Sequence, residues 1–212
     1  MTFFVKTPMS DPDFKGSMNG KIDLAALSKA VPMDSITLSG VIEMAISMAG
    51  KLSMIEKEQY DKFSASGKLG IANMVVEMAG YPKVEIKDAA FQFTPAFAEI
   101  VKADIVVADK SDFSISGQLR NYIPFVFKNE TLTGSMAMTS RLVDASGIMA
   151  AMATDTAVTE TDTSSLSVFA VPRNIDFKFN AVIEKFTYDN IIAEKVKAGV
   201  IVKDGVLSFR DA

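Results

Sequence analysis

Alternation of apolar and polar residues is the feature of this sequence that most restricts its fold. The stretch from Ile175 to Ile183 shows it most clearly, because every second residue is apolar: Ile175, Phe177, Phe179, Ala181 and Ile183. Successive side chains of a β-strand point to opposite faces, so this pattern predicts a strand with one apolar and one largely polar face. One side of the predicted sheet must therefore be shielded from water.

The same alternation recurs along most of the chain. It is present in Gly16–Leu24, Ile36–Met48 and Leu132–Leu142. Thirteen alternating positions in Ile36–Met48 predict either one long strand or a bend at Gly40, since strands usually have about five or six residues. Further strands are predicted at Ala98–Val107 and Phe113–Leu119.

Turn residues join these strands into hairpins. Gly80-Tyr81-Pro82 separates two strands between Ser66 and Gln92, because Gly accepts a positive φ and Pro fixes φ. On the first of these strands we expect Leu69, Ile71 and Val75 to share a face. Asp204-Gly205 predicts a two-residue turn between Val196–Val202 and Val206–Phe209.

The predicted fold class is mainly β: a long, twisted, largely antiparallel sheet, a meander that can form a groove, with a few short helices. Asp23 is predicted to cap a helix at Leu24–Ala30, and Met54–Phe63 has the composition of a surface helix. Asn121–Phe127 is interpreted as a strand that passes Pro124 at an edge or bulge. A Greek-key sandwich is the alternative, because the sequence does not order the strands.

The predicted domain organisation is simple. Residues 1–15 are expected to form an N-terminal tail, and residues 16–212 a single β-rich domain. Polar, acidic residues without periodicity predict a flexible loop at about 150–168.

Composition excludes several classes of function. The chain has neither Cys nor His, so disulfides, thiolate chemistry, the usual zinc sites and His-based triads are excluded. The net charge is only −4, without a basic block, and therefore predicts no nucleic-acid partner. Hydrophobic residues make up 49% of the chain, a surplus that must be covered.

No motif predicts catalysis, a cofactor or a metal site. Gly67-Lys68-Leu69-Gly70 lacks the spacing of a phosphate-binding loop. Asp11 and Asp13 lack the ligands that would complete a calcium loop, and Asp109 and Asp112 are interpreted as turn residues rather than paired carboxylates. The sequon at Asn129 is interpreted as a hairpin turn.

No apolar run in the sequence is long enough to span a bilayer as a helix, and residues 1–16 do not have the pattern of a signal peptide. We expect any membrane anchor to lie outside this sequence.

Patterns of Gly, Pro and alternating apolar residues from Gly16 onward carry a family resemblance. The segments are Gly16 with Lys21-Ile22-Asp23-Leu24, Ser66-Gly67-Lys68-Leu69, Phe93-Thr94-Pro95, Ser111-Asp112-Phe113 through Gly117-Gln118-Leu119-Arg120-Asn121, Leu132-Thr133-Gly134-Ser135, and Val171-Pro172-Arg173-Asn174-Ile175-Asp176. Together they resemble the C-terminal region of the AsmA-like family.

The resemblance implies a periplasmic module, anchored in the inner membrane by a helix elsewhere in the protein, that serves outer-membrane biogenesis. Relatives include bridge-like lipid-transfer proteins whose curved sheets hold acyl chains in an apolar groove. Phospholipid acyl chains, and other envelope proteins, are the partners it implies. It supplies no catalytic residues.

The candidate lipid-binding residues lie on the predicted apolar strand faces: Met44, Met48, Ile115, Leu119, Met136, Met138, Ile175, Phe177 and Phe179. Two uses of such a face stay open, a closed core and a groove for lipid, and flexible Met side chains suit both. The alternative function is a structural module that docks through a sheet edge. The third hypothesis for the function is an enzyme whose active site is assembled from residues that are distant in the sequence.

Overall fold

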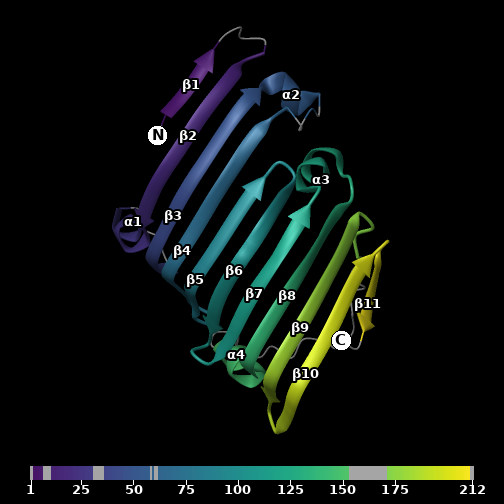
Figure 1. Cartoon of the computed structure of the whole chain (residues 1–212). Helices are drawn as coiled ribbons and strands as arrows, with labels where there is room; N and C mark the ends of the chain where they lie inside the picture. The colour runs from purple at the N-terminus through teal and green to yellow at the C-terminus, as the bar shows by residue number, and fades with distance from the viewer. Residues whose placement is uncertain are drawn as a thin grey trace.

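A single β-sheet organises the whole described chain (Figure 1). The computed structural model describes residues 2–6, 11–30, 36–57, 59, 62–152 and 171–210. The strands are β1 (Thr2–Lys6), β2 (Asp13–Asp23), β3 (Ile36–Lys51), β4 (Ser64–Met78), β5 (Val84–Thr94), β6 (Phe97–Val107), β7 (Ser111–Arg120), β8 (Leu132–Asp144), β9 (Ile175–Tyr188), β10 (Ile191–Lys203) and β11 (Val206–Arg210).

Strand order in the sheet is the order of the chain, from β1 to β11. Every neighbouring pair is antiparallel except β8 and β9, which run parallel. A mainly β, largely antiparallel meander with short helices is thus confirmed. The Greek-key alternative is wrong, because such a fold places strands beside partners that are distant in the chain.

The predicted hairpin turns are present. Asp204 and Gly205 have φ values of 54° and 78°, and Lys203 pairs with Val206 across them. Two consecutive positive φ values are the signature of the two-residue turn whose twist matches that of the flanking strands. Gly80, in the turn between β4 and β5, has a φ of 76°.

A bulge in β4, opposite Gly40 of β3, changes which residues of β4 share a face. Gly40 has a φ of 105°, and the register of β3 with β4 shifts at this residue. Both expectations for this stretch are therefore met in part: β3 is one long strand, and it is irregular at Gly40. Asn73 has a φ of 49°, and after it Met74 pairs with Ile86. Met74, rather than the predicted Val75, therefore lies on the face of Leu69.

The described ranges contain four short helices, which lie at the ends of strands: α1 (Leu24–Ala30), α2 (Leu52–Glu56), α3 (Tyr122–Lys128) and α4 (Ala145–Met152). The bounds of α1 are those predicted, and the Ala26 amide donates to Asp23 Oδ1 at 3.1 Å as a capping bond should. The predicted helix at Met54–Phe63 is wrong in extent. Helix α2 begins earlier and ends at Glu56, and β4 has begun by Ser64.

Helix α3 replaces a predicted strand. Asn121, with a φ of 60°, turns the chain out of β7, and the hydroxyl of Tyr122 donates to the carbonyl of Thr94 at 2.7 Å. Pro124 is tolerated because it lies in the first helical turn, where backbone N–H groups lack helical acceptors. Asn129, with a φ of 57°, ends α3 rather than forming a hairpin turn.

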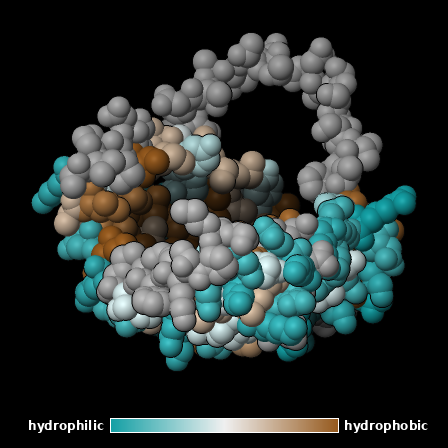
Figure 2. Space-filling view, turned by 90° about the horizontal axis from the view of Figure 1, so that it is seen from above, coloured by the Kyte–Doolittle hydropathy of each residue, from teal (hydrophilic) through white to brown (hydrophobic). Residues whose placement is uncertain are grey.

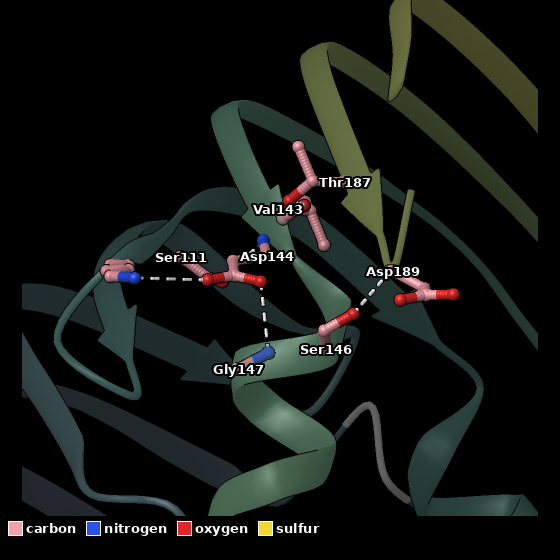
Figure 3. Close-up of polar contacts among 8 residues, drawn as sticks. Ser111, Val143, Asp144, Ser146, Gly147, Thr187 and Asp189 are labelled. Atoms are coloured by element: carbon pink, nitrogen blue, oxygen red, sulfur yellow. Dashed lines mark hydrogen bonds and ion pairs between the residues drawn. The ribbon is translucent and has the colours of Figure 1, made fainter. Parts of the chain in front are cut away.

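Helix α4, which was not predicted, is held at the end of β8 by polar contacts (Figure 3). Asp144 Oδ1 accepts a bond from the Gly147 amide at 3.0 Å, and the Asp144 amide donates to Ser111 Oγ at 2.9 Å. Ser146 Oγ accepts from the Asp189 amide at 2.6 Å, which links α4 to the turn between β9 and β10. The fully buried Ser111 thus has a structural role.

The predicted tail and loop have different outcomes. Within residues 1–15 the structure places β1 and the start of β2, so part of that stretch belongs to the sheet. Of the predicted loop at about 150–168, residues 150–152 end α4 and the remainder lies outside the described residues. None of the helices in the described ranges is long and apolar enough to cross a membrane.

Few side chains are buried in this architecture. The buried hydrophobic residues are Leu24, Ala65, Ala89, Ala103, Val143 and Ala181, most of which are small. The extensive contacts between strands all join neighbours in the sheet. Among the described residues, no second sheet or long helix therefore covers either face of this one.

Candidate functional site

One side of the sheet carries three adjacent rows of apolar residues and glycines that the register aligns across the strands. The first row is Met18, Ile46, Gly67, Phe93, Ala98, Leu119, Gly134, Phe177, Val202 and Leu207. The second is Gly20, Met44, Leu69, Phe91, Ile100, Gly117, Met136, Phe179, Val200 and Phe209. The third is Ile22, Ile42, Ile71, Ala89, Ala103, Ile115, Met138, Ala181 and Ala198. We call this side the apolar face.

The apolar face lies in the hollow of a curved sheet. Figure 2 shows hydrophobic residues gathered on the inner side of the curve and hydrophilic residues over its outer side. Most large side chains of the three rows are partly exposed rather than buried. The face is therefore accessible over much of its extent.

All nine predicted site residues lie on the apolar face. Met44, Ile115, Leu119, Met136, Met138, Phe177 and Phe179 belong to the three rows. Met48 and Ile175 extend this face along β3 and β9, by the alternation of each strand. Distant parts of the chain thus contribute to one surface.

A hollow of ≈ 180 Å³ opens on the apolar face between β5 and β9. Its apolar lining includes Phe91, Phe93, Ile100, Leu119, Met136 and Phe177. Phe91, Phe93 and Ile100 were not among the predicted site residues. The register of β5 with β4 and β6, which alternation alone does not give, places them there.

Glycines shape the floor of this face. A side chain at Gly67 would overlap the ring of Phe93, which lies over it. At Gly134 a Cβ atom would come within 2.8 Å of Leu119 Cδ2 and 3.2 Å of Phe177 Cδ2. Large side chains from neighbouring strands therefore lie over the glycines, and the floor is flatter there than an unbroken row of large residues would make it.

The outer side of the sheet is mainly polar. The row that backs the hollow is Asn19, Ala45, Lys68, Gln92, Glu99, Gln118, Ser135, Lys178, Ile201 and Ser208. Exposed ion pairs lie on this side as well, such as Lys21 with Glu43 at 3.0 Å. The two sides of the sheet therefore differ sharply in polarity.

A larger hollow of ≈ 410 Å³ lies mainly on the outer side, near the start of β4. Its lining includes the exposed polar side chains of Ser17, Asn19, Ser47, Ser66 and Lys68. Ile46, Phe93 and Phe97 also line this hollow, so it mixes polar and apolar side chains, whereas the three rows of the apolar face carry no polar side chain.

The carboxylates considered in the sequence as a pair have separate partners. Asp109 lies 3.0 Å from Lys83 Nζ, whereas Asp112 Oδ2 accepts a bond from Arg141 Nε at 3.0 Å. Burial would raise the pKa of Asp112, but bonds from the Arg141 side chain and two backbone amides lower it overall. The Ser114 hydroxyl, which donates to Asp104, is the main cause of the lowered pKa of that carboxyl. These are the environments of carboxylates that stay ionised, not of general acids.

No group of three or more acidic side chains in the described ranges is placed to hold a metal ion. Comparison with known protein families, with curated proteins and with solved structures finds no match to this chain.

Proposed function

We propose that this chain is a non-enzymatic module that shields lipid acyl chains on its apolar face. The observation that carries the proposal is the set of three apolar rows, unbroken by any polar side chain, on a sheet face with no opposing layer among the described residues.

The size of the face supports a binding role. With about 4.8 Å between strands and about 6.8 Å between rows, two rows across ten strands and one across nine cover on the order of 1,000 Å². The largest apolar patch of an ordinary soluble protein is about 300–600 Å². A face of this size favours a large apolar ligand, because water contact with it is costly.

The chemistry of the face favours acyl chains over a polar ligand. Polar side chains are missing from all three rows, so the rows offer hydrophobic contact without directional hydrogen bonds. Met18, Met44, Met136 and Met138 add flexible thioether side chains that adapt to ligands of irregular shape. The hollow beside Phe93 and Phe177 is the place where we expect the deepest contact.

Phe177→Asp tests the proposal, with Val182→Asp as the matched control. Both residues lie on β9, but Phe177 is on the apolar face, and Val182 is 42% exposed on the opposite side. We expect Phe177→Asp to lower the free energy of unfolding by about 1–3 kcal/mol and to abolish uptake of a fluorescent fatty acid. Val182→Asp should leave uptake unchanged.

Three results would argue against the proposal. Complete unfolding of Phe177→Asp would indicate a closed core, because an unpaired carboxylate in a core costs several kcal/mol. Equal uptake by a stable Phe177→Asp variant would exclude this part of the face. Repeated purification without lipid in native mass spectrometry, together with no uptake by the parent chain, would exclude acyl-chain binding altogether.

The cellular setting is a further part of the proposal and rests on the family resemblance. We propose that the module acts in the periplasm, on lipids that move during outer-membrane biogenesis, as part of a protein anchored in the inner membrane. Protease protection of the tagged protein in spheroplasts would place it in the cytoplasm and contradict this setting.

A further inference from the structure

Strand β11 is an edge strand with an unusual amount of exposed apolar surface. Val206 is 59% exposed, Leu207 41% and Phe209 78%. Only β10 pairs with it among the described residues. An exposed apolar edge of this kind is a template for pairing with another strand.

The neighbouring part of the same edge is protected against such pairing. Strand β11 covers only Gly199–Lys203 of β10, and in the part of the chain that the structure describes Ile191–Ala198 has no second neighbour. That stretch carries Glu194, Lys195 and Lys197, and Lys195 has a positive φ of 55°. Charged side chains are a usual protection of open edges, yet Val206–Phe209 has none.

The backbone of β11 is suited to pair with a copy of itself. In an antiparallel ladder, alternate residues direct both N–H and C=O to the same neighbour. The two-residue turn directs the N–H and C=O groups of Val206 to β10. By alternation, the N–H and C=O groups of Ser208 and Arg210 are directed to β10 as well. Leu207 and Phe209 therefore direct their N–H and C=O groups to the open side.

We infer that two copies of this chain associate through antiparallel pairing of β11 with β11 about a two-fold axis through Ser208. In this register Leu207 of each copy lies opposite Phe209 of the other, and all four outward groups of each strand are bonded. The positive charge of Arg210 lies opposite the partner's Val206, so the two arginines are at opposite ends. A two-fold interface of this kind is closed and uses the same patch twice.

The pairing would also join the two apolar faces. Leu207 and Phe209 end the first and second apolar rows, and a two-fold axis normal to the sheet keeps both faces on the same side. The first row of one copy would then continue into the second row of its partner. The use of this joined face for lipid rests on the function proposed above, whereas the pairing itself does not.

Cysteine crosslinking tests the register, because the chain has no cysteine of its own. In Ser208→Cys the two cysteines lie directly opposite each other, as a pair that exchanges no backbone hydrogen bonds. The Cα atoms of such a pair lie about 4.5 Å apart, a separation that a disulfide can span. Val206→Cys is the matched control on the same side of the same strand, where the paired copies would be about 14 Å apart. We expect oxidation to convert Ser208→Cys to a disulfide dimer at least about tenfold faster than Val206→Cys.

Sedimentation equilibrium of the unmodified chain gives an independent readout. We expect a species of twice the chain mass of 22.9 kDa, and on the order of tenfold weaker association in Phe209→Lys, which places an unpaired charge against the partner's Leu207. Lys introduced at Val182, away from the edge, should leave association unchanged.

Other results would overturn the inference. They are a monomer at concentrations up to about 100 μM, equal crosslinking of the two cysteine variants, or an open series of larger oligomers. Fatty-acid uptake by the same samples separates the two proposals. A disulfide dimer that takes up no lipid supports the pairing and contradicts the lipid function. A monomer that takes up lipid supports the lipid function and contradicts the pairing.

Discussion

The ring of Phe93 on β5 lies directly over Gly67 on β4, where a Cβ atom would overlap it. Phe93 also lines the hollow on the apolar face. Gly67 is therefore needed for the position of a neighbouring side chain, and it is not one of the glycines with a positive φ. Its importance can be tested separately from backbone strain.

Gly67→Ala is expected to displace the Phe93 ring and to destabilise the chain by about 1–3 kcal/mol. Gly20→Ala is the control on the same face, because the nearest atom to a Cβ there is Met44 Cγ at 4.0 Å. That substitution should be neutral or stabilising by up to about 1 kcal/mol. Urea unfolding measures both. Removing the ring with Phe93→Ala should suppress much of the effect of Gly67→Ala, and strict additivity of the two substitutions would contradict the overlap.

Asp112 is expected to be the most important carboxylate for the contact between β7 and β8. It accepts bonds from Arg141 Nε and from the backbone amides of Arg141 and Leu142, at 3.0, 3.2 and 3.0 Å. Asp112→Asn removes the charge and one acceptor, so we expect a loss of about 1.5–3 kcal/mol in thermal or urea unfolding. Glu43→Gln, at an exposed ion pair with Lys21, should change stability little. Equal losses in the two variants would contradict this ranking.

Acid is expected to destabilise the fold through its aspartates. The pKa of Asp144 is lowered by the Gly147 amide, and those of Asp104 and Asp112 are lowered as well. A lowered folded-state pKa means that the unfolded chain binds protons first, near its ordinary pKa of about 3.9. The stabilisation is therefore complete above about pH 5 and is lost progressively as the pH falls through the unfolded and then the folded pKa values.

Melting temperatures between pH 8 and pH 2.5 measure this dependence. We expect a plateau from about pH 6 to pH 7.5, because the chain has no His to titrate there. Asp112→Asn should lose less stability between pH 5 and pH 3 than the parent. A main transition near pH 6.5, or identical acid profiles for the two proteins, would contradict the assignment.

Much of the sheet could be predicted because its signal is local. One face of β9 is apolar from Ile175 to Ile183, and Asp204-Gly205 carries the turn preference in two residues. The faces of β4 could be predicted only up to Asn73, since a positive φ at a single residue inverts the pattern that follows. Alternation alone does not reveal such a bulge.

Other features depend on contacts between distant residues. Tyr122 begins a helix where alternation favoured a strand, and its hydroxyl bonds to the Thr94 carbonyl on β5. The parallel pairing of β8 with β9 joins residues more than 40 positions apart in the chain, such as Leu132 and Ile175, and no periodicity encodes it. The candidate site was predicted in part for the same reason. The place of Phe177 on the apolar face can be predicted from the alternation of its own strand, whereas the place of Phe91 in the hollow is set by the register of three strands.

The agreement between strand order and chain order has a consequence for how this protein acquires its structure. Since each strand pairs with the one made just before it, every addition closes only a short loop, apart from the longer connection that precedes β9. Low contact order of this kind favours fast folding. Stability then accumulates approximately as a sum of nearest-neighbour terms, as in a linear array of repeats. A chain of this design can form its sheet progressively as it is synthesised, and can gain or lose a terminal hairpin without altering the pairing of the strands that remain.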